Sequence, residues 1–274
     1  MAKKSANELS FLEHLEELRW HLVRSILAIV VIAIVAFIFK DIIFDVIILG
    51  PKSPDFFTNR VLCSLGQLVN VEKLCINTNP FQVININMAG QFMTHIMISI
   101  LTGFILAFPY VFYEFWNFMR PALYQNEKNV ARGAVFFSSV LFMLGILFGY
   151  FLICPLSVHF LGSYSVSEQV LNQINLKSYI STVASVSLAA GLIFELPILV
   201  YFLSKIGLVT PEFLRKYRKH SLVVILTLAA IITPPDIFSQ VMVCLPLLIL
   251  YEIGIRISKS IEKKRDAAFE EEAE

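Results

Sequence analysis

Glu195 is the only acid deep inside a long apolar stretch of this sequence, which makes it the first candidate for chemistry. A charged side chain at the centre of a bilayer costs about 2.5–3.5 kcal/mol even on insertion scales, so this carboxyl should face protein or water. Two interpretations stay open. The carboxyl contacts a ligand or partner helix in a polar cavity, or it is a structural group, neutral by desolvation and hydrogen-bonded to another span.

Further acids gather on a short amphipathic helix that is predicted before the first apolar stretch. Ser10, with Glu13 three residues later, forms a capping box. One face is apolar at helical spacing and consists of Phe11, Leu15, Leu18 and Leu22. The other faces carry Glu13, Glu16, Glu17 and Arg19. Acids beside anionic lipid do not help a helix to anchor, so the simplest interpretation is a solvated face.

The elements that position these residues are predicted membrane spans. Only 16% of the 274 residues are charged, against about 25% in an ordinary soluble domain. A spanning helix needs roughly 20 apolar residues to cross about 30 Å of hydrocarbon. We expect an all-α integral membrane protein with six transmembrane helices, at residues 22–40, 88–113, 133–157, 178–204, 221–232 and 237–257. Residues 1–21 then form a cytoplasmic segment and residues 258–274 a charged cytoplasmic tail.

The last three spans have unusual features. Pro197 should kink the fourth helix just behind Glu195 and help to form a concave shape. Leu222–Ile232 would extend only about 17 Å, which should thin the bilayer or recruit neighbours. Asp236 can cap the sixth helix, whereas Gln240, one turn deeper, is a candidate for polar contact with a partner's single helix.

The distribution of basic residues predicts the orientation. The segments that contain the termini and the second and fourth connections carry 17 Lys and Arg, against five on the opposite side. The positive-inside rule therefore places both termini in the cytoplasm. Four glutamates precede the first apolar run and no small-residue cleavage pattern follows it, so we expect it to stay as the first span rather than to be a cleaved signal peptide.

The cysteines and the absence of known catalytic motifs limit the possible classes of function further. Cys63 and Cys75 lie in the first outer loop, where an oxidising compartment would permit a disulfide; the pairing stays open. The sequence contains no His-Glu-x-x-His, Gly-x-Ser-x-Gly or Gly-rich phosphate loop. His14 and His21 have no further obvious ligands. We therefore expect no enzyme, cofactor, metal site or nucleotide site, and the net charge of +1 does not suggest nucleic acid.

Four sequence pieces, in this order on this topology, carry a resemblance to a known family. The first is His14-Leu15-Glu16-Glu17-Leu18-Arg19, and the second runs from Phe115 to Tyr124 with Glu127 behind it. The others are Phe194-Glu195-Leu196-Pro197 and residues 233–240, Thr-Pro-Pro-Asp-Ile-Phe-Ser-Gln. The set resembles the TatC family, the multispanning receptor of the twin-arginine protein translocase, over essentially the whole chain apart from the tails and part of the first outer loop.

The resemblance implies a receptor for signal peptides with two adjacent arginines, borne by folded proteins bound for export. A guanidinium is best satisfied by a carboxylate in a two-pronged contact, and Glu17 and Glu127 match the family positions for it. Phe118 matches a third position, where it could pack on the peptide, although an interfacial aromatic belt also explains it. Arg19 matches the motif and would orient Glu16 or Glu17.

The resemblance also implies a location and partners. These are the bacterial cytoplasmic (inner) membrane, TatA/TatB-type single-span subunits and an oligomeric translocase, with Glu195, Gln240 and Asp236 as intramembrane or partner contacts. The sequence departs from the family pattern in a long outer loop, Asp41–Asn87, and in Arg120, which would repel an arginine ligand unless it points away. The alternative function is a proton-coupled secondary transporter that uses Glu195, but no convincing internal repeat supports it.

Overall fold

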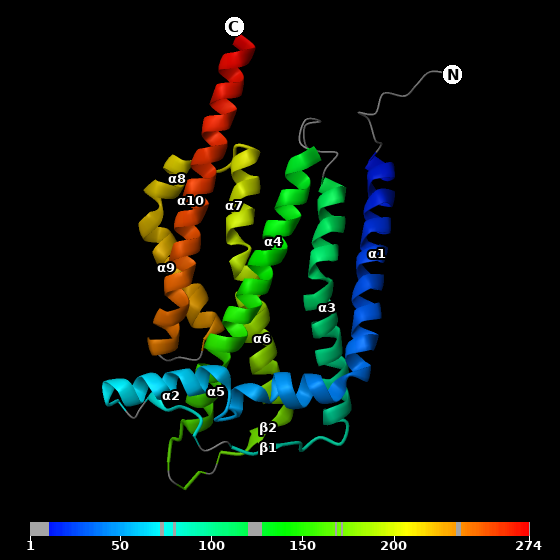
Figure 1. The fold of residues 1–274 in the computed structure, drawn as a ribbon. Helices are drawn as coiled ribbons and strands as arrows, with labels where there is room; N and C mark the ends of the chain where they lie inside the picture. Colours follow the sequence, from blue (N-terminus) through cyan, green and yellow to red (C-terminus); the bar gives the residue numbers. More distant parts are fainter. Residues whose placement is uncertain are drawn as a thin grey trace. The chain divides into compact units, whose positions relative to one another are not determined.

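The computed structural model describes residues 11–71, 74–78, 81–119, 128–167, 169–170, 172–233 and 237–273, almost all of them helical (Figure 1). Five helical segments of the described chain are long and apolar enough to cross a membrane, which confirms the predicted helical membrane fold. These segments are Leu15–Ile38, Gly90–Phe118, Gly133–Ser163, Leu176–Lys205 and Gln240–Lys263. A helix also forms where the short fifth span is predicted: α9 (Arg218–Ile232) has 15 residues, about 22 Å at helical rise, and is not among these five segments.

The helices fall into two compact units, of which one contains α1 (Phe11–Ile38), most of α3 (Gly90–Met119) and the first part of α4 (Lys128–Phe148). α1 and α3 approach closely at Gly103, where a Cβ atom would lie 2.7 Å from the carbonyl oxygen of Ile29. Glycine is therefore required at that crossing, as small residues commonly are where membrane helices meet. Further along, His95 Nε2 donates to the carbonyl oxygen of Phe37 over 3.0 Å.

The second unit contains the end of α4, which continues through a π-helical turn (Gly149–Ile153) into α5 (Cys154–Ser163). Pro155 follows this turn, and the π geometry is consistent with a proline that cannot donate a helical hydrogen bond. Glycines permit close packing on α6 (Leu176–Phe194), since a Cβ at Gly145 would lie 2.7 Å from the carbonyl oxygen of Ala190. The helical segment at the predicted third span ends at Ser163, six residues beyond the expected end at residue 157.

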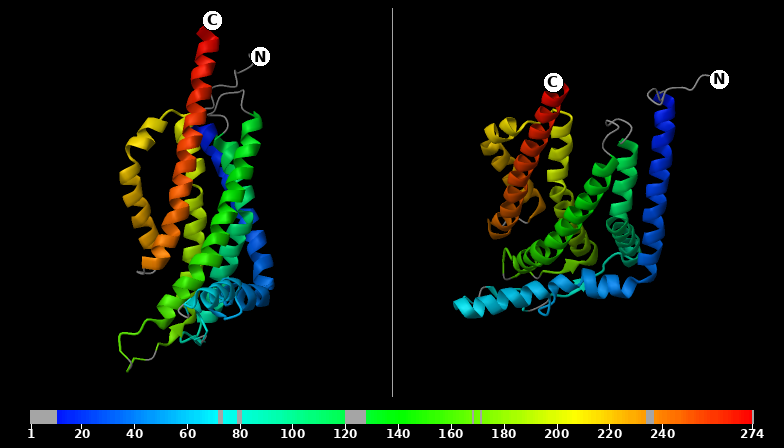
Figure 2. Two further views of the ribbon diagram at one scale, coloured as in Figure 1. Left: turned by 60° about the vertical axis from the view of Figure 1, so that its left-hand side comes forward. Right: turned by 45° about the horizontal axis from the view of Figure 1, so that its top comes forward.

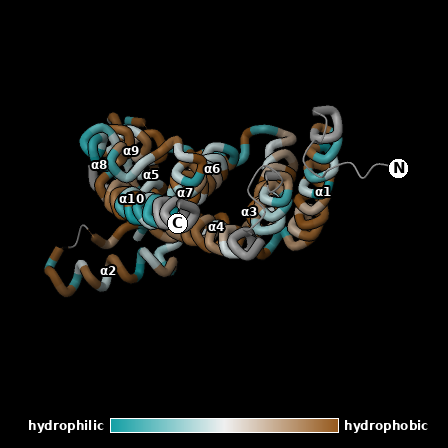
Figure 3. Tube along the Cα trace, turned by 90° about the horizontal axis from the view of Figure 1, so that it is seen from above, coloured by the Kyte–Doolittle hydropathy of each residue, from teal (hydrophilic) through white to brown (hydrophobic). Residues whose placement is uncertain are grey.

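Pro197 interrupts the predicted fourth span as expected. α6 ends at Phe194 and α7 (Leu196–Lys205) begins two residues later, so Glu195 lies at the break. α8 (Pro211–Lys216) and α9 follow, and α10 (Ile237–Ala273) is one continuous helix through the predicted tail. Ser204 on α7 donates to Ser258 on α10 over 2.8 Å, both buried. Figure 3 shows polar residues concentrated at α8, whereas α9 is largely apolar.

The segment between α1 and α3, which is predicted to be the first outer loop, is folded. A π-helical turn (Ile42–Ile48) and a 3₁₀ turn (Gly50–Lys52) lead into α2 (Phe57–Val69), which Figures 1 and 2 show lying crosswise to α10. The strand β1 (Val83–Ile84) pairs in parallel with β2 (Ile174–Asn175). The buried Asn77 side chain donates to the carbonyl oxygens of Pro51 and Pro155, each over 3.2 Å. These bonds tie the loop to α5.

Cys63 in α2 and Cys75 behind it are joined by a disulfide, with 4.1 Å between their Cα atoms. The other two cysteines, Cys154 and Cys244, are buried and free. We expect the denatured, unreduced chain to take up two alkyl groups, and four after reduction, because only an existing bond protects a thiol once packing is lost. Intact mass after alkylation measures this. Four alkyl groups before reduction would show that the bond is absent.

Candidate functional site

A buried carboxylate lies between α1 and α3. Glu114 Oε2 is 2.5 Å from Nδ1 of His21, and the two side chains are 5% and 14% exposed. Arg24 on α1 adds a longer ion-pair contact of 4.0 Å to the same oxygen. Tyr110, one turn earlier on α3, also hydrogen-bonds this carboxylate. Two helices therefore satisfy a group that would be costly to bury alone.

Phe118, a predicted site residue, lies against the same histidine. Its ring meets the His21 ring edge-on, with 6.3 Å between centroids and 63° between planes. Glu114 and Phe118 are one turn apart and so share a face of α3. The ring contact with His21 gives Phe118 a fixed neighbour on α1. The surroundings of Phe118 therefore include more than an aromatic belt at the membrane surface.

The register of α1 against α3 indicates that Glu17 lies at the same level as Phe118. The helices run antiparallel, as His95 meets Phe37 near one end and Glu114 meets His21 near the other. One turn beyond the last pair, Glu17 on α1 therefore comes level with Phe118 on α3. Glu17 is half-buried. Glu17 and Phe118, which are predicted from two separate segments, thus lie at the same end of the α1–α3 pair.

Of the other residues predicted for this site, the structure describes Arg19 but not Glu127. Arg19 is exposed, and within the described part of the chain it forms no ion pair with Glu16 or Glu17, so the expected orienting contact is not present. Glu127 and Arg120 lie outside the described residues. The second carboxylate proposed from the resemblance therefore stays a prediction.

Glu195 occupies the break between α6 and α7 in the second unit. Its backbone carbonyl accepts hydrogen bonds from the amides of Ile198 and Leu199, each over 3.0 Å. The side chain is half-buried and its Oε1 atom is buried. The helix break and the acid thus coincide, which is the local arrangement that Pro197 predicts.

The residues predicted at the start of α10 are only partly described. Gln240 is half-buried, and its Nε2 donates to the carbonyl oxygen of Leu226 on α9 over 3.3 Å. Gln240 therefore links the short helix to its successor. Asp236 lies outside the described residues, and its capping role stays a prediction.

Sequence reasoning missed the His21–Glu114 pair. Glu114 is not singled out from the sequence, and His21 is considered there only as a metal ligand without companions. The described residues contain no group of three or more His, Cys, Asp or Glu that could hold a metal ion. A usable signal was present: a histidine at the start of one span and an acid at the end of the next lie at similar depth when consecutive spans run antiparallel.

Several long apolar helices, with a carboxylate held between two of them, define a multi-pass helical membrane protein. Residues 13–246 match the family described as Sec-independent protein translocase protein (TatC), and the chain belongs to this family. The resemblance inferred from the sequence is thereby confirmed. The chain is a component of the twin-arginine, or Sec-independent, protein translocase, which is a transport family and not an enzyme family.

Individual relatives align with nearly the whole chain. The "Sec-independent protein translocase protein TatC" of Blattabacterium sp. subsp. Periplaneta americana is 41% identical over 96% of this chain and 100% of its own length. That of Aquifex aeolicus is 36% identical over 92% and 96%. A solved structure, "Twin Arginine Translocase Receptor- TatC in DDM", is similar with a TM-score of 0.68 and 34% identity, covering 90% of this chain and 99% of that one.

Proposed function

We propose that this chain is the signal-peptide receptor of its translocase. It binds the paired arginines of folded cargo proteins through Glu17 and Glu127 and then assembles with TatA/TatB-type single-span subunits. The observation that carries the proposal is the α1–α3 register, which brings Glu17 level with Phe118. A half-buried carboxylate beside an aromatic ring suits a guanidinium, which pairs with the acid and packs on the ring.

The neighbouring Glu114 supports this assignment of roles. Its carboxylate is already bound by His21, Arg24 and Tyr110. Within the described residues Glu17 has no ion pair, so, unlike Glu114, it is available to a ligand cation. The two similar solved structures are of twin-arginine translocase receptors, which supports the same role for this chain.

The proposal includes a topology. Six spans with both termini in the cytoplasm place the Glu17 end of α1 on the side from which cargo arrives. Glu195, Gln240 and Asp236 are then candidate contacts inside the membrane, within a concave surface that receives the signal peptide or a single-span subunit. A half-buried acid at a helix break is suited to this, because a carboxyl group within a membrane favours a polar partner over lipid.

Crosslinking tests the receptor proposal directly. A signal peptide with a photoreactive residue beside its two arginines is mixed with the full chain in membrane vesicles, and adducts are mapped by mass spectrometry. We expect adducts around Glu17 and Phe118, and a loss of about tenfold or more when both arginines are lysines, because an ammonium cannot form the two-pronged contact. Equal crosslinking by both peptides, with adducts elsewhere, would contradict the proposal.

A further inference from the structure

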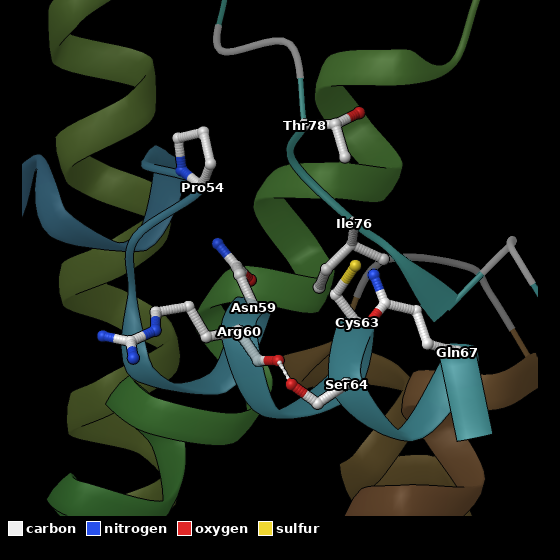
Figure 4. A pocket seen from close by; sticks show the side chains of 8 residues that line it. All are labelled: Pro54, Asn59, Arg60, Cys63, Ser64, Gln67, Ile76 and Thr78. Carbon is white, nitrogen blue, oxygen red and sulfur yellow. Dashed lines mark hydrogen bonds between the residues drawn. The ribbon is translucent and has the colours of Figure 1, made fainter.

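α2 exposes two different faces. Its buried side contains Thr58, Asn59 and Gly66. One exposed face is apolar, with side chains between 42% and 80% exposed, and consists of Phe57, Val61, Leu65, Leu68 and Val69. The adjoining exposed face is polar and consists of Arg60, Ser64 and Gln67. Figure 4 shows these three polar side chains around a pocket beside Cys63.

The helix is fixed in this orientation. The buried Asn59 side chain donates to the carbonyl oxygens of Pro51 and Ser53, over 3.1 and 2.7 Å. The hydroxyl of Thr58 donates to the carbonyl oxygen of Phe151. The disulfide from Cys63 holds the same side of the helix. Because two hydrogen-bonding side chains and a disulfide act together, α2 cannot turn its apolar face inward.

The apolar face continues the surface of a membrane span. Phe57 meets Phe151 edge-on, with 6.3 Å between ring centroids, and Phe151 belongs to the candidate span Gly133–Ser163. Phe56 stacks on the same ring at 5.5 Å, and Tyr150 lies next to it. Tyrosine is enriched where a span leaves the hydrocarbon for the headgroups, so Tyr150 is consistent with a membrane boundary at this cluster. α2 starts at this aromatic cluster and runs crosswise to α10 (Figures 1 and 2).

We propose that α2 is an interfacial helix that lies on the bilayer its neighbouring spans cross. The apolar face enters the boundary between headgroups and acyl chains, and the polar face stays in water. Such a division of one helix surface, parallel to the membrane plane, is typical of helices that lie in an interface. Arg60 stands at the edge of the apolar face, where its guanidinium can bind lipid phosphate. The partner is therefore lipid, and α2 anchors the folded outer loop to it.

Lipid photocrosslinking tests this proposal with adjacent positions as matched controls. Benzoylphenylalanine replaces Leu65 or Leu68 on the apolar face, and Ser64 or Gln67 on the polar face. Each full chain is reconstituted into vesicles of phosphatidylethanolamine and phosphatidylglycerol at 3:1. We expect at least about fivefold more lipid adduct from the two leucine positions, since an interfacial helix buries only its apolar face.

Two outcomes overturn the proposal: equal lipid adduct from both faces, or adducts of the leucine positions with a second chain or another protein instead of lipid. A milder pair of variants covers the case in which a bulky probe disturbs folding. Leu65→Trp and Ser64→Trp are compared by the quenching that brominated lipids cause in the added tryptophan. We expect clear quenching for Leu65→Trp alone. No difference between the two variants rejects an interfacial α2.

Discussion

The Glu17→Gln variant is expected to bind a twin-arginine peptide about 10- to 100-fold more weakly than the unchanged chain. A hydrogen bond to a charged group is worth about 1.5–3 kcal/mol, and each 1.4 kcal/mol is a factor of ten in Kd. Glutamine keeps the size and the half-buried position of the side chain but loses the charge and one acceptor. The register that places Glu17 level with Phe118 makes this loss local to the proposed peptide site.

The measurement is a peptide titration of the purified full chain in detergent. Glu16→Gln is the matched control, because Glu16 is the neighbouring acid, is exposed and points to another side of α1. We expect its Kd to stay within about twofold of the parent, since an exposed charge contributes little. If the two variants bind equally well, Glu17 is not part of the site. If the Glu17→Gln variant weakens arginine and lysine peptides alike, its effect is not recognition of the guanidinium.

The His21→Ala variant is expected to lose about 2–3 kcal/mol of stability. Removing one partner leaves a buried carboxyl short of a hydrogen bond, which costs more than the intact bond contributes. Arg24 and Tyr110 still contact Glu114, so the cost stays below that of a fully isolated charge. The edge-on contact with Phe118 is also lost. The readout is the free energy of unfolding in mixed micelles under titration with a denaturing detergent.

A double variant separates the pair from general damage to the helix. In His21→Leu with Glu114→Leu, the polar pair becomes an apolar one, and we expect most of the loss to be recovered, because replacing both members of a buried pair is often nearly neutral. The coupling between the two sites should then be about 1–3 kcal/mol. Additive losses would mean that the two side chains do not stabilise one another.

The sequence predicts much of the fold because long apolar runs and prolines act locally. The predicted spans 22–40, 88–113 and 178–204 overlap α1, α3 and the pair α6–α7, although α1 begins eleven residues earlier and α3 ends six residues later; Pro197 predicts the break at Glu195. α2 is not predicted in this way, because its 13 residues are too short for a span and its apolar residues occupy only part of its surface. The disulfide partners could be named, but the helix that carries Cys63 could not.

The residues of the candidate site also divide into those that sequence motifs predict and those that depend on helix packing. Glu17 and Phe118 are found from motifs on two separate segments, which need no knowledge of how the helices pack. The His21–Glu114 pair depends on the register between α1 and α3, two helices that approach closely at Gly103. A single glycine among many apolar residues gives no indication in the sequence of which neighbour it will meet. Tertiary contacts of this kind need the structure.

The length of α10 has a mechanical consequence. Its 37 residues extend about 55 Å at helical rise, almost twice the thickness of the hydrocarbon core. Pro246 lies inside it, at the kind of position where helices bend. A bend of about 10° there would displace the far end of the rod, about 40 Å away, by roughly 7 Å. α10 can therefore act as a lever arm, which converts a small tilt within the bilayer into a large movement outside it.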